Sequence, residues 1–129
     1  MSFKLIPFNR IKPKGVCVSS IQSQSGRSLF HDDEKTLLKA GVKLEIVDAI
    51  LRLLEEKLNG RELHSKQWRQ LKDGDGLCEI KYRNPLLRLY YYIDTNTKCC
   101  VIMSFVQKSN NRDQTLEINR LKKFRTDYL

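Results

Sequence analysis

The chain has 129 residues, of which 40% are hydrophobic and 30% are charged, a composition typical of one soluble globular domain. No segment approaches the roughly 20 apolar residues of a membrane-spanning helix, and residues 1–14 contain no apolar run of the kind that a secretion signal needs. The four cysteines lack a disulfide-rich spacing. We therefore expect reduced thiols and a cytoplasmic protein.

The net charge of +9 is unevenly distributed along the chain. Residues 1–31 contain five Lys/Arg and no acid, residues 32–62 contain six basic and eight acidic residues, and residues 63–129 contain thirteen basic and seven acidic residues. The basic excess at both ends predicts a polyanionic partner, either a nucleic acid or an acidic protein that covers the same surface. A membrane surface fits less well, because no helix pairs a basic face with exposed aromatic residues.

Residues 1–14 form a basic N-terminal arm. Within it, residues 3–8 fit either an edge strand or a loose segment, because Pro7 and Pro13 restrict strand pairing. Residues 15–22 are the better candidate for a first strand, and the Ser-Gln-Ser-Gly sequence that follows predicts a turn.

Two helices are predicted between residues 32 and 59. The acidic run Asp32-Asp33-Glu34 is typical of a first helical turn, and Gly41 ends that helix. The second helix, from about residue 43 to 59, carries one apolar stripe. We expect both helices to cover the apolar face of a sheet; the alternative is a helical hairpin that mediates dimerisation. The polar connector 61–76 contains an Asp-x-Asp-Gly run but lacks the closing glutamate of a calcium loop.

The region 77–108 predicts three consecutive strands, separated by turns at Asn84-Pro85 and at residues 94–97. If the strands form a meander, one face belongs to the core and the other is open. The alternation places five basic and aromatic side chains on the open face: Lys81, Arg83, Arg88, Tyr90 and Tyr92. Such a face suits RNA phosphates and unstacked bases, and the alternative is a solvated sheet face of ordinary composition.

A final helix is predicted over about residues 113–127, after a capping cluster at 109–111. The order strand, two helices, three strands, helix indicates one α+β domain. We expect a mainly antiparallel four-stranded sheet packed against two N-terminal helices, with a C-terminal helix.

The sequence contains no evident metal or cofactor site. His31 and His64 have no second ligand at helical or loop spacing, and there is no glycine-rich phosphate loop or nucleophile motif. A chemistry that fits the basic face is metal-independent RNA cleavage, in which the 2′-hydroxyl of the RNA is the nucleophile. The protein then orients the hydroxyl, stabilises the charged phosphorane and moves protons.

Four segments lie in the order and spacing of a known family: 77–81 (LCEIK), 87–91 (LRLYY), 101–108 (VIMSFVQK) and Glu117-Ile118 with the helix that follows. They resemble the signature of the phage-derived Gp49-like and HigB-type toxins of the RelE/ParE toxin–antitoxin superfamily, over about residues 24–129. The resemblance implies a single RelE-like toxin domain over residues 1–129. It also implies the activity of a type II toxin, a ribosome-dependent mRNA endoribonuclease (mRNA interferase) that inhibits translation.

The partners implied are mRNA, the ribosome and a cognate antitoxin of the helix-turn-helix kind, without a membrane or a small-molecule cofactor. By position, the resemblance assigns catalysis to Lys81, Arg88 and Lys108, and we add Tyr90 of the same predicted face as a catalytic candidate. Arg83 and Tyr92 of that face, with Lys66 and Arg112, are the candidates for RNA binding. Glu79 is either a base or, as we favour, an ion-pair partner of Arg88. Tyr128 is the C-terminal aromatic candidate, for which core packing is the alternative.

Three features depart from the family pattern: the arm at 1–14, Gln107-Lys108 in place of a Lys-Lys pair, and Met103 in place of a histidine. The alternative function is therefore a non-catalytic binding protein on the same fold. Such a protein is either a gyrase-directed ParE-like toxin or a phage-derived module that binds RNA or protein. The arm is expected to give either further RNA contacts or a docking edge.

Overall fold

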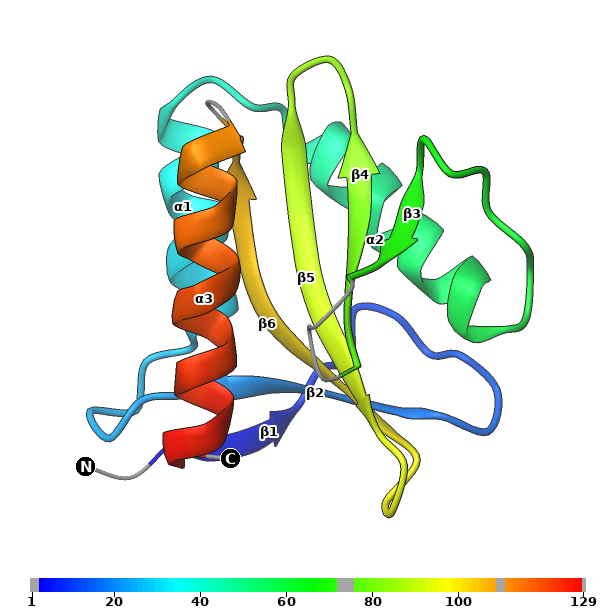
Figure 1. The fold of residues 1–129 in the computed structure, drawn as a ribbon, viewed down its shortest axis with the longest axis vertical. Coiled ribbons are helices and arrows are strands. Elements are labelled where there is room, and N and C mark those ends of the chain that lie inside the picture. The colour runs from blue at the N-terminus through cyan, green and yellow to red at the C-terminus, as the bar shows by residue number, and fades with distance from the viewer. Residues whose placement is uncertain (1–2, 72–75, 109–110, 129) are drawn as a thin grey trace.

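A computed structural model of the chain describes all residues except 1–2, 72–75, 109–110 and 129. The described part forms six strands and three helices (Figure 1). In chain order they are β1 (Lys4–Pro7), β2 (Cys17–Gln22), α1 (Leu29–Lys39), α2 (Leu44–Leu58), β3 (Trp68–Gln70), β4 (Leu77–Tyr82), β5 (Leu87–Asp94), β6 (Cys99–Gln107) and α3 (Asn111–Tyr128).

The strands form one sheet with the order β1-β2-β6-β5-β4-β3. Neighbouring strands pair antiparallel, except that β2 and β6 run parallel. The prediction of a mainly antiparallel four-stranded sheet against two N-terminal helices is therefore wrong. The fold is α+β with a six-stranded mixed sheet and three helices.

Two short edge strands account for the larger sheet. β1 is the edge-strand alternative for residues 3–8, and it pairs with β2 from Lys4 opposite Gln22 to Pro7 opposite Ser19. β3 lies within the segment that was predicted as a polar connector and has only three residues. Strands this short contain too little alternation for the sequence pattern to reveal them.

The helices α1 and α2 cover one face of the sheet. The α2 stripe Val47, Ile50, Leu51 and Leu54 is buried, and it packs in one cluster with sheet residues that include Ile80. The stripe therefore packs within the chain, as expected for helices that cover the sheet.

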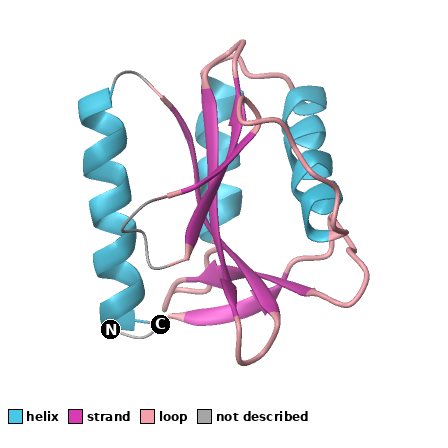
Figure 2. Ribbon diagram, turned by 45° about the vertical axis from the view of Figure 1, so that its right-hand side comes forward, coloured by secondary structure: helices cyan, strands magenta, loops and turns pink. Residues whose placement is uncertain are grey.

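The opposite face of the sheet is covered in part by α3, which lies across the sheet from α2 (Figure 2). Leu121 of α3 is buried in one cluster with Tyr90 and Tyr92, and Ile118 and Phe124 pack against that cluster. These three α3 residues recur every three positions and form an apolar stripe that needs a covering surface. The face that carries the two tyrosines is therefore closed over part of its length, whereas the sequence predicted it to be open.

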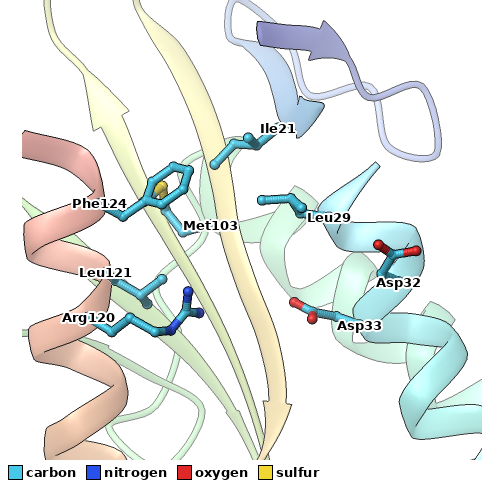
Figure 3. Close-up of a pocket in the computed structure, with 8 residues that line it drawn as sticks. All are labelled: Ile21, Leu29, Asp32, Asp33, Met103, Arg120, Leu121 and Phe124. Atoms are coloured by element: carbon cyan, nitrogen blue, oxygen red, sulfur yellow. The ribbon is translucent and has the colours of Figure 1, made fainter. Parts of the chain in front are cut away.

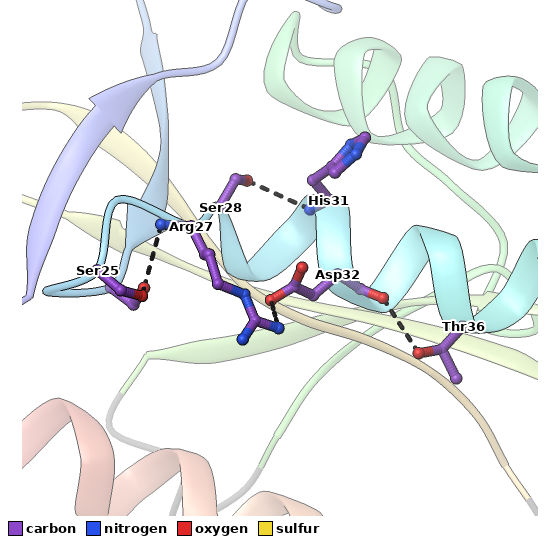
Figure 4. Close-up of polar contacts among 7 residues, drawn as sticks. Ser25, Arg27, Ser28, His31, Asp32 and Thr36 are labelled. Atoms are coloured by element: carbon purple, nitrogen blue, oxygen red, sulfur yellow. Dashed lines mark hydrogen bonds and ion pairs between the residues drawn. The ribbon is translucent and has the colours of Figure 1, made fainter.

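Side chains near the N-terminus of α1 fix the start of that helix (Figure 4). Ser28 is the N-cap, and its hydroxyl accepts a hydrogen bond from the backbone N–H of His31 at 3.2 Å. Asp32 forms an ion pair with Arg27 at 2.8 Å, and the hydroxyl of Thr36 donates to the Asp32 carbonyl. The helix thus begins just before the acidic run that predicted it.

The basic arm contacts both α1 and α2. The guanidinium of Arg10 pairs with Glu34 at 2.5 Å and with Asp48 at 2.9 Å. The backbone N–H of Lys12 donates to the Glu55 carboxylate at 2.7 Å. The arm therefore connects the β1 end of the sheet to the helical layer, which the sequence did not predict.

We predict that Leu54→Ala lowers the free energy of unfolding by about 2–5 kcal/mol, because it leaves a cavity in the core. Leu44→Ala is the matched control on the same helix, at a position that is 53% exposed. It is expected to change the free energy by only about 0.5 kcal/mol. Chemical denaturation followed by circular dichroism measures both, and equal losses would contradict the packing of α2 against the sheet.

Candidate functional site

Five cationic side chains border one groove beside β3, β4 and β5. The groove has a volume of about 510 Å³ and is termed the basic groove. Its charged lining residues are Lys66, Arg69, Lys81, Arg83 and Arg88, and Ser65, Trp68 and Leu86 complete the lining. Because none of these described lining residues is a carboxylate, the groove favours an anionic ligand.

Strand pairing explains why these residues meet. Lys81 on β4 lies opposite Arg88 on β5, and Arg69 on β3 lies opposite Glu79 on β4. Residues that are directly opposite, or two apart on one strand, project from the same face of a sheet. Arg69 was missed in the sequence, because only the pairing of β3 with β4 brings it to this face.

The carboxylate of Glu79 is completely buried between two arginines. Its Oε1 lies 2.9 Å from Nη2 of Arg69, and its Oε2 lies 3.8 Å from Nε of Arg88. The side-chain amide of Gln114 on α3 donates a hydrogen bond to Oε2 at 3.0 Å. Of the two roles predicted for Glu79, the structure contains the ion pair, with Arg69 as a closer partner than Arg88.

Arg88 is almost as deeply buried, with 8% of its surface exposed. Its Nη1 donates to the backbone carbonyl of Leu87 at 2.9 Å. Its Nε makes no hydrogen bond among the described residues, and neither does Oε1 of Glu79, although Arg69 lies within ion-pair distance of that oxygen. Each of these two atoms nevertheless faces an opposite charge within one of the two ion pairs of Glu79.

Lys81 is half-buried beside these arginines. Burial lowers the pKa of its ammonium group; the charge of Glu79 raises that pKa, and the charges of Arg69, Arg88 and Lys108 lower it. The net effect is a lowered pKa. Near neutral pH, a larger fraction of such a lysine is unprotonated, and so able to act as a general base, than of an ordinary lysine.

Tyr90 and Tyr92 do not line the groove. They lie beneath α3 and are only 1% and 5% exposed. Burial, followed by the negative charge of Glu79, raises the pKa of the Tyr90 phenol. The guanidinium of Arg125 lies 4.0 Å from the centre of the Tyr92 ring. Neither tyrosine is therefore placed to stack a base in the groove or to donate a proton there.

The four remaining predicted site residues differ in their positions relative to the groove. Lys66 lines it. Lys108 is close enough for its charge to act on Lys81, and its backbone N–H donates to the Leu86 carbonyl at 2.8 Å. Arg112 is exposed near the start of α3. Tyr128 is the last residue of α3, and its side chain lies outside the part of the chain that the structure describes.

A second hollow of about 340 Å³ adjoins the basic groove. The two share Lys66, Lys81 and Arg83, and the hollow is completed by Leu53, Gln67, Tyr82 and Asn84. An aromatic ring and two amides next to three cations are the residue types that bind a nucleobase beside its phosphate. Tyr82 was not predicted as a site residue, because the alternation places it on the opposite face from Lys81.

Comparisons with protein-family models, with curated proteins and with solved structures find no match for this chain. Among the described residues, no helix is both long enough and apolar enough to cross a membrane. The same part of the chain contains no group of three or more His, Cys, Asp or Glu residues arranged to hold a metal ion.

We predict that two variants shift the pKa of Lys81 in opposite directions. Arg69→Gln removes a positive charge and is expected to raise this pKa, whereas Glu79→Gln removes the negative charge and lowers it further. Arg52→Gln, at an exposed position on α2, is the control and leaves it unchanged. NMR titration of isotopically methylated lysines measures the three values. Shifts of the same sign in both groove variants would contradict the assigned electrostatics.

Proposed function

We propose that this protein is an RNA-cleaving toxin, a ribosome-dependent mRNA endoribonuclease that needs no metal and is silenced by an antitoxin. The observation that carries the proposal is the basic groove, in which four other cations accompany Lys81, whose pKa is lowered. The cations suit a phosphate, and the lysine suits a general base, which simple binding does not require. The motifs at 77–81, 87–91 and 101–108 support the same function.

In the proposed reaction, an RNA phosphate lies in the basic groove. Neutral Lys81 takes the proton of the 2′-hydroxyl, the 2′-oxygen attacks the adjacent phosphorus, and the bond from phosphorus to the 5′-oxygen breaks. Lys108 returns a proton to the leaving 5′-oxygen, which gives a 5′-hydroxyl and a 2′,3′-cyclic phosphate. Arg69 and Arg83 stabilise the negative charge that develops on the phosphorane oxygens.

The proposed partners are mRNA, the ribosome and an antitoxin. The groove contacts phosphates, which position an RNA but do not specify its sequence. A ribosome that presents the mRNA in a fixed alignment complements such a groove. An antitoxin of the helix-turn-helix kind silences the toxin when an acidic segment of it covers the groove. We place the toxin in the cytoplasm, where it meets ribosomes.

A non-catalytic binding protein is the second candidate. Glu79 neutralises part of the charge of Arg69 and Arg88, and Tyr90 lies under α3 and outside the groove. Both features favour binding over chemistry. This candidate holds RNA or an acidic protein in the groove without cutting it, and a gyrase-directed toxin is one such protein.

We predict that Lys81→Gln reduces cleavage of mRNA on programmed ribosomes by at least about 100-fold, because it removes the general base. Lys35→Gln removes the same charge from an exposed position on α1 and keeps the wild-type rate. Primer extension along the mRNA measures cleavage, and melting temperatures check that both variants are folded. Undiminished cleavage by Lys81→Gln would contradict the catalytic role. RNA binding without any cleavage by the wild type would favour the second candidate.

Binding to single-stranded RNA is expected to depend on salt through the groove cations. Arg83→Gln should weaken binding and reduce the slope of log K against log salt concentration by about 0.7 for the lost phosphate contact. Arg52→Gln keeps the wild-type slope, because this exposed arginine lies on α2 and not in the groove. Fluorescence anisotropy over a series of salt concentrations measures both. An unchanged slope for Arg83→Gln would mean that RNA binds elsewhere on the protein.

A further inference from the structure

A separate cavity lies between α1, α3 and the β2–β6 part of the sheet (Figure 3). Its volume is about 200 Å³, below the roughly 300–1,000 Å³ of sites for drug-sized ligands. Met103, Leu121 and Phe124 contribute an apolar wall, and Asp33 of α1 and Arg120 of α3 contribute opposing charges. The cavity shares no lining residue with the basic groove.

Most of the charged groups around this cavity already have partners. Asp32 forms an ion pair with Arg27 at 2.8 Å. Arg120 is held by Glu117 through two hydrogen bonds of 3.1 and 2.6 Å. Asp33 has no ion-pair partner among the described residues. The charges of Asp32 and Arg27 cancel, and so do those of Arg120 and Glu117. The carboxylate of Asp33 therefore gives the cavity a net negative charge.

The carboxylate of Asp33 is half-buried and points across the cavity toward Arg120 (Figure 3). Its Oδ2 accepts a hydrogen bond from the backbone N–H of Phe105 at 3.0 Å. The pKa of this carboxyl is raised to about 6, chiefly by burial; the hydrogen bond from Phe105 and the charge of Arg120 act to lower it, and the charges of Glu117 and Asp32 act to raise it. A carboxylate in a poorly solvated place is stabilised by a cation that enters beside it.

We propose that this cavity binds a small organic cation, namely a primary ammonium carried on a short apolar body. The ammonium forms an ion pair with Asp33, and the hydrocarbon part packs against Met103, Leu121 and Phe124. A neutral ligand of the same shape gains only the apolar contact. An organic anion is repelled by Asp33, and the charge of Arg120 that would attract it is offset by the ion pair with Glu117.

Butylammonium, butanol and butyrate are matched probes of this proposal, because they share a short chain and differ in charge. In NMR titrations of the wild-type protein, we expect butylammonium to bind at least about tenfold more tightly than butanol, and butyrate not to bind. The perturbed signals should be the Met103 methyl and the Asp33 amide. Equal binding of butylammonium and butanol, or binding of neither, would overturn the proposal.

The variant Asp33→Asn removes the charge but keeps an oxygen that accepts the hydrogen bond from Phe105. It is expected to bind butylammonium and butanol alike. Asp127→Asn makes the same change at an exposed position on α3 and should keep the wild-type preference. Melting temperatures check the fold of both variants. A preference for butylammonium that survives in Asp33→Asn would show that the cation binds elsewhere and would overturn the assignment.

Binding of butylammonium should also weaken as the pH falls through about 6, because protonation removes the charge of Asp33. Butanol binding should not change over this range. If butylammonium binding is equally strong well below pH 6, the ion pair with Asp33 is contradicted.

Discussion

The burial of Glu79 between two arginines is the interaction on which the basic groove depends. A carboxylate without solvent exposure needs opposite charges nearby, and Arg69 and Arg88 provide them from the two neighbouring strands. The pairing therefore joins β4 to its two neighbours, the short edge strand β3 and β5, while Gln114 extends it to α3. Removing one partner of a buried ion pair typically costs about 3–5 kcal/mol, so loss of the Arg88 charge should destabilise the fold.

The same carboxylate sets the electrostatics of the groove. The five cations that line the basic groove repel each other, and the negative charge of the buried Glu79 offsets part of that repulsion. Burial nevertheless keeps the pKa of Lys81 below its ordinary value. The groove is consequently cationic enough for a phosphate and also contains a lysine that gives up its proton more readily than an ordinary lysine, which links the fold to the proposed RNA chemistry.

The individual elements were easier to predict from the sequence than their assembly. Alternation and helical periodicity run long enough to reveal α2 and the three strands between 77 and 107. The parallel pairing of β2 with β6 joins residues 17–19 to 99–101 and leaves no local pattern. For the site, alternation correctly placed Lys81, Arg88 and Glu79 on one face. It does not indicate what covers a face, and α3 buries Tyr90 of the same set.

Cleavage of an mRNA that carries a single 2′-deoxynucleotide at the cut position tests the proposed chemistry most directly. The wild-type protein acts on ribosomes programmed with this mRNA and with its unmodified counterpart. We predict that cleavage at the modified position is lost while binding persists, because the 2′-oxygen is the nucleophile. Cleavage of both mRNAs at the same rate would contradict RNA cleavage by this groove.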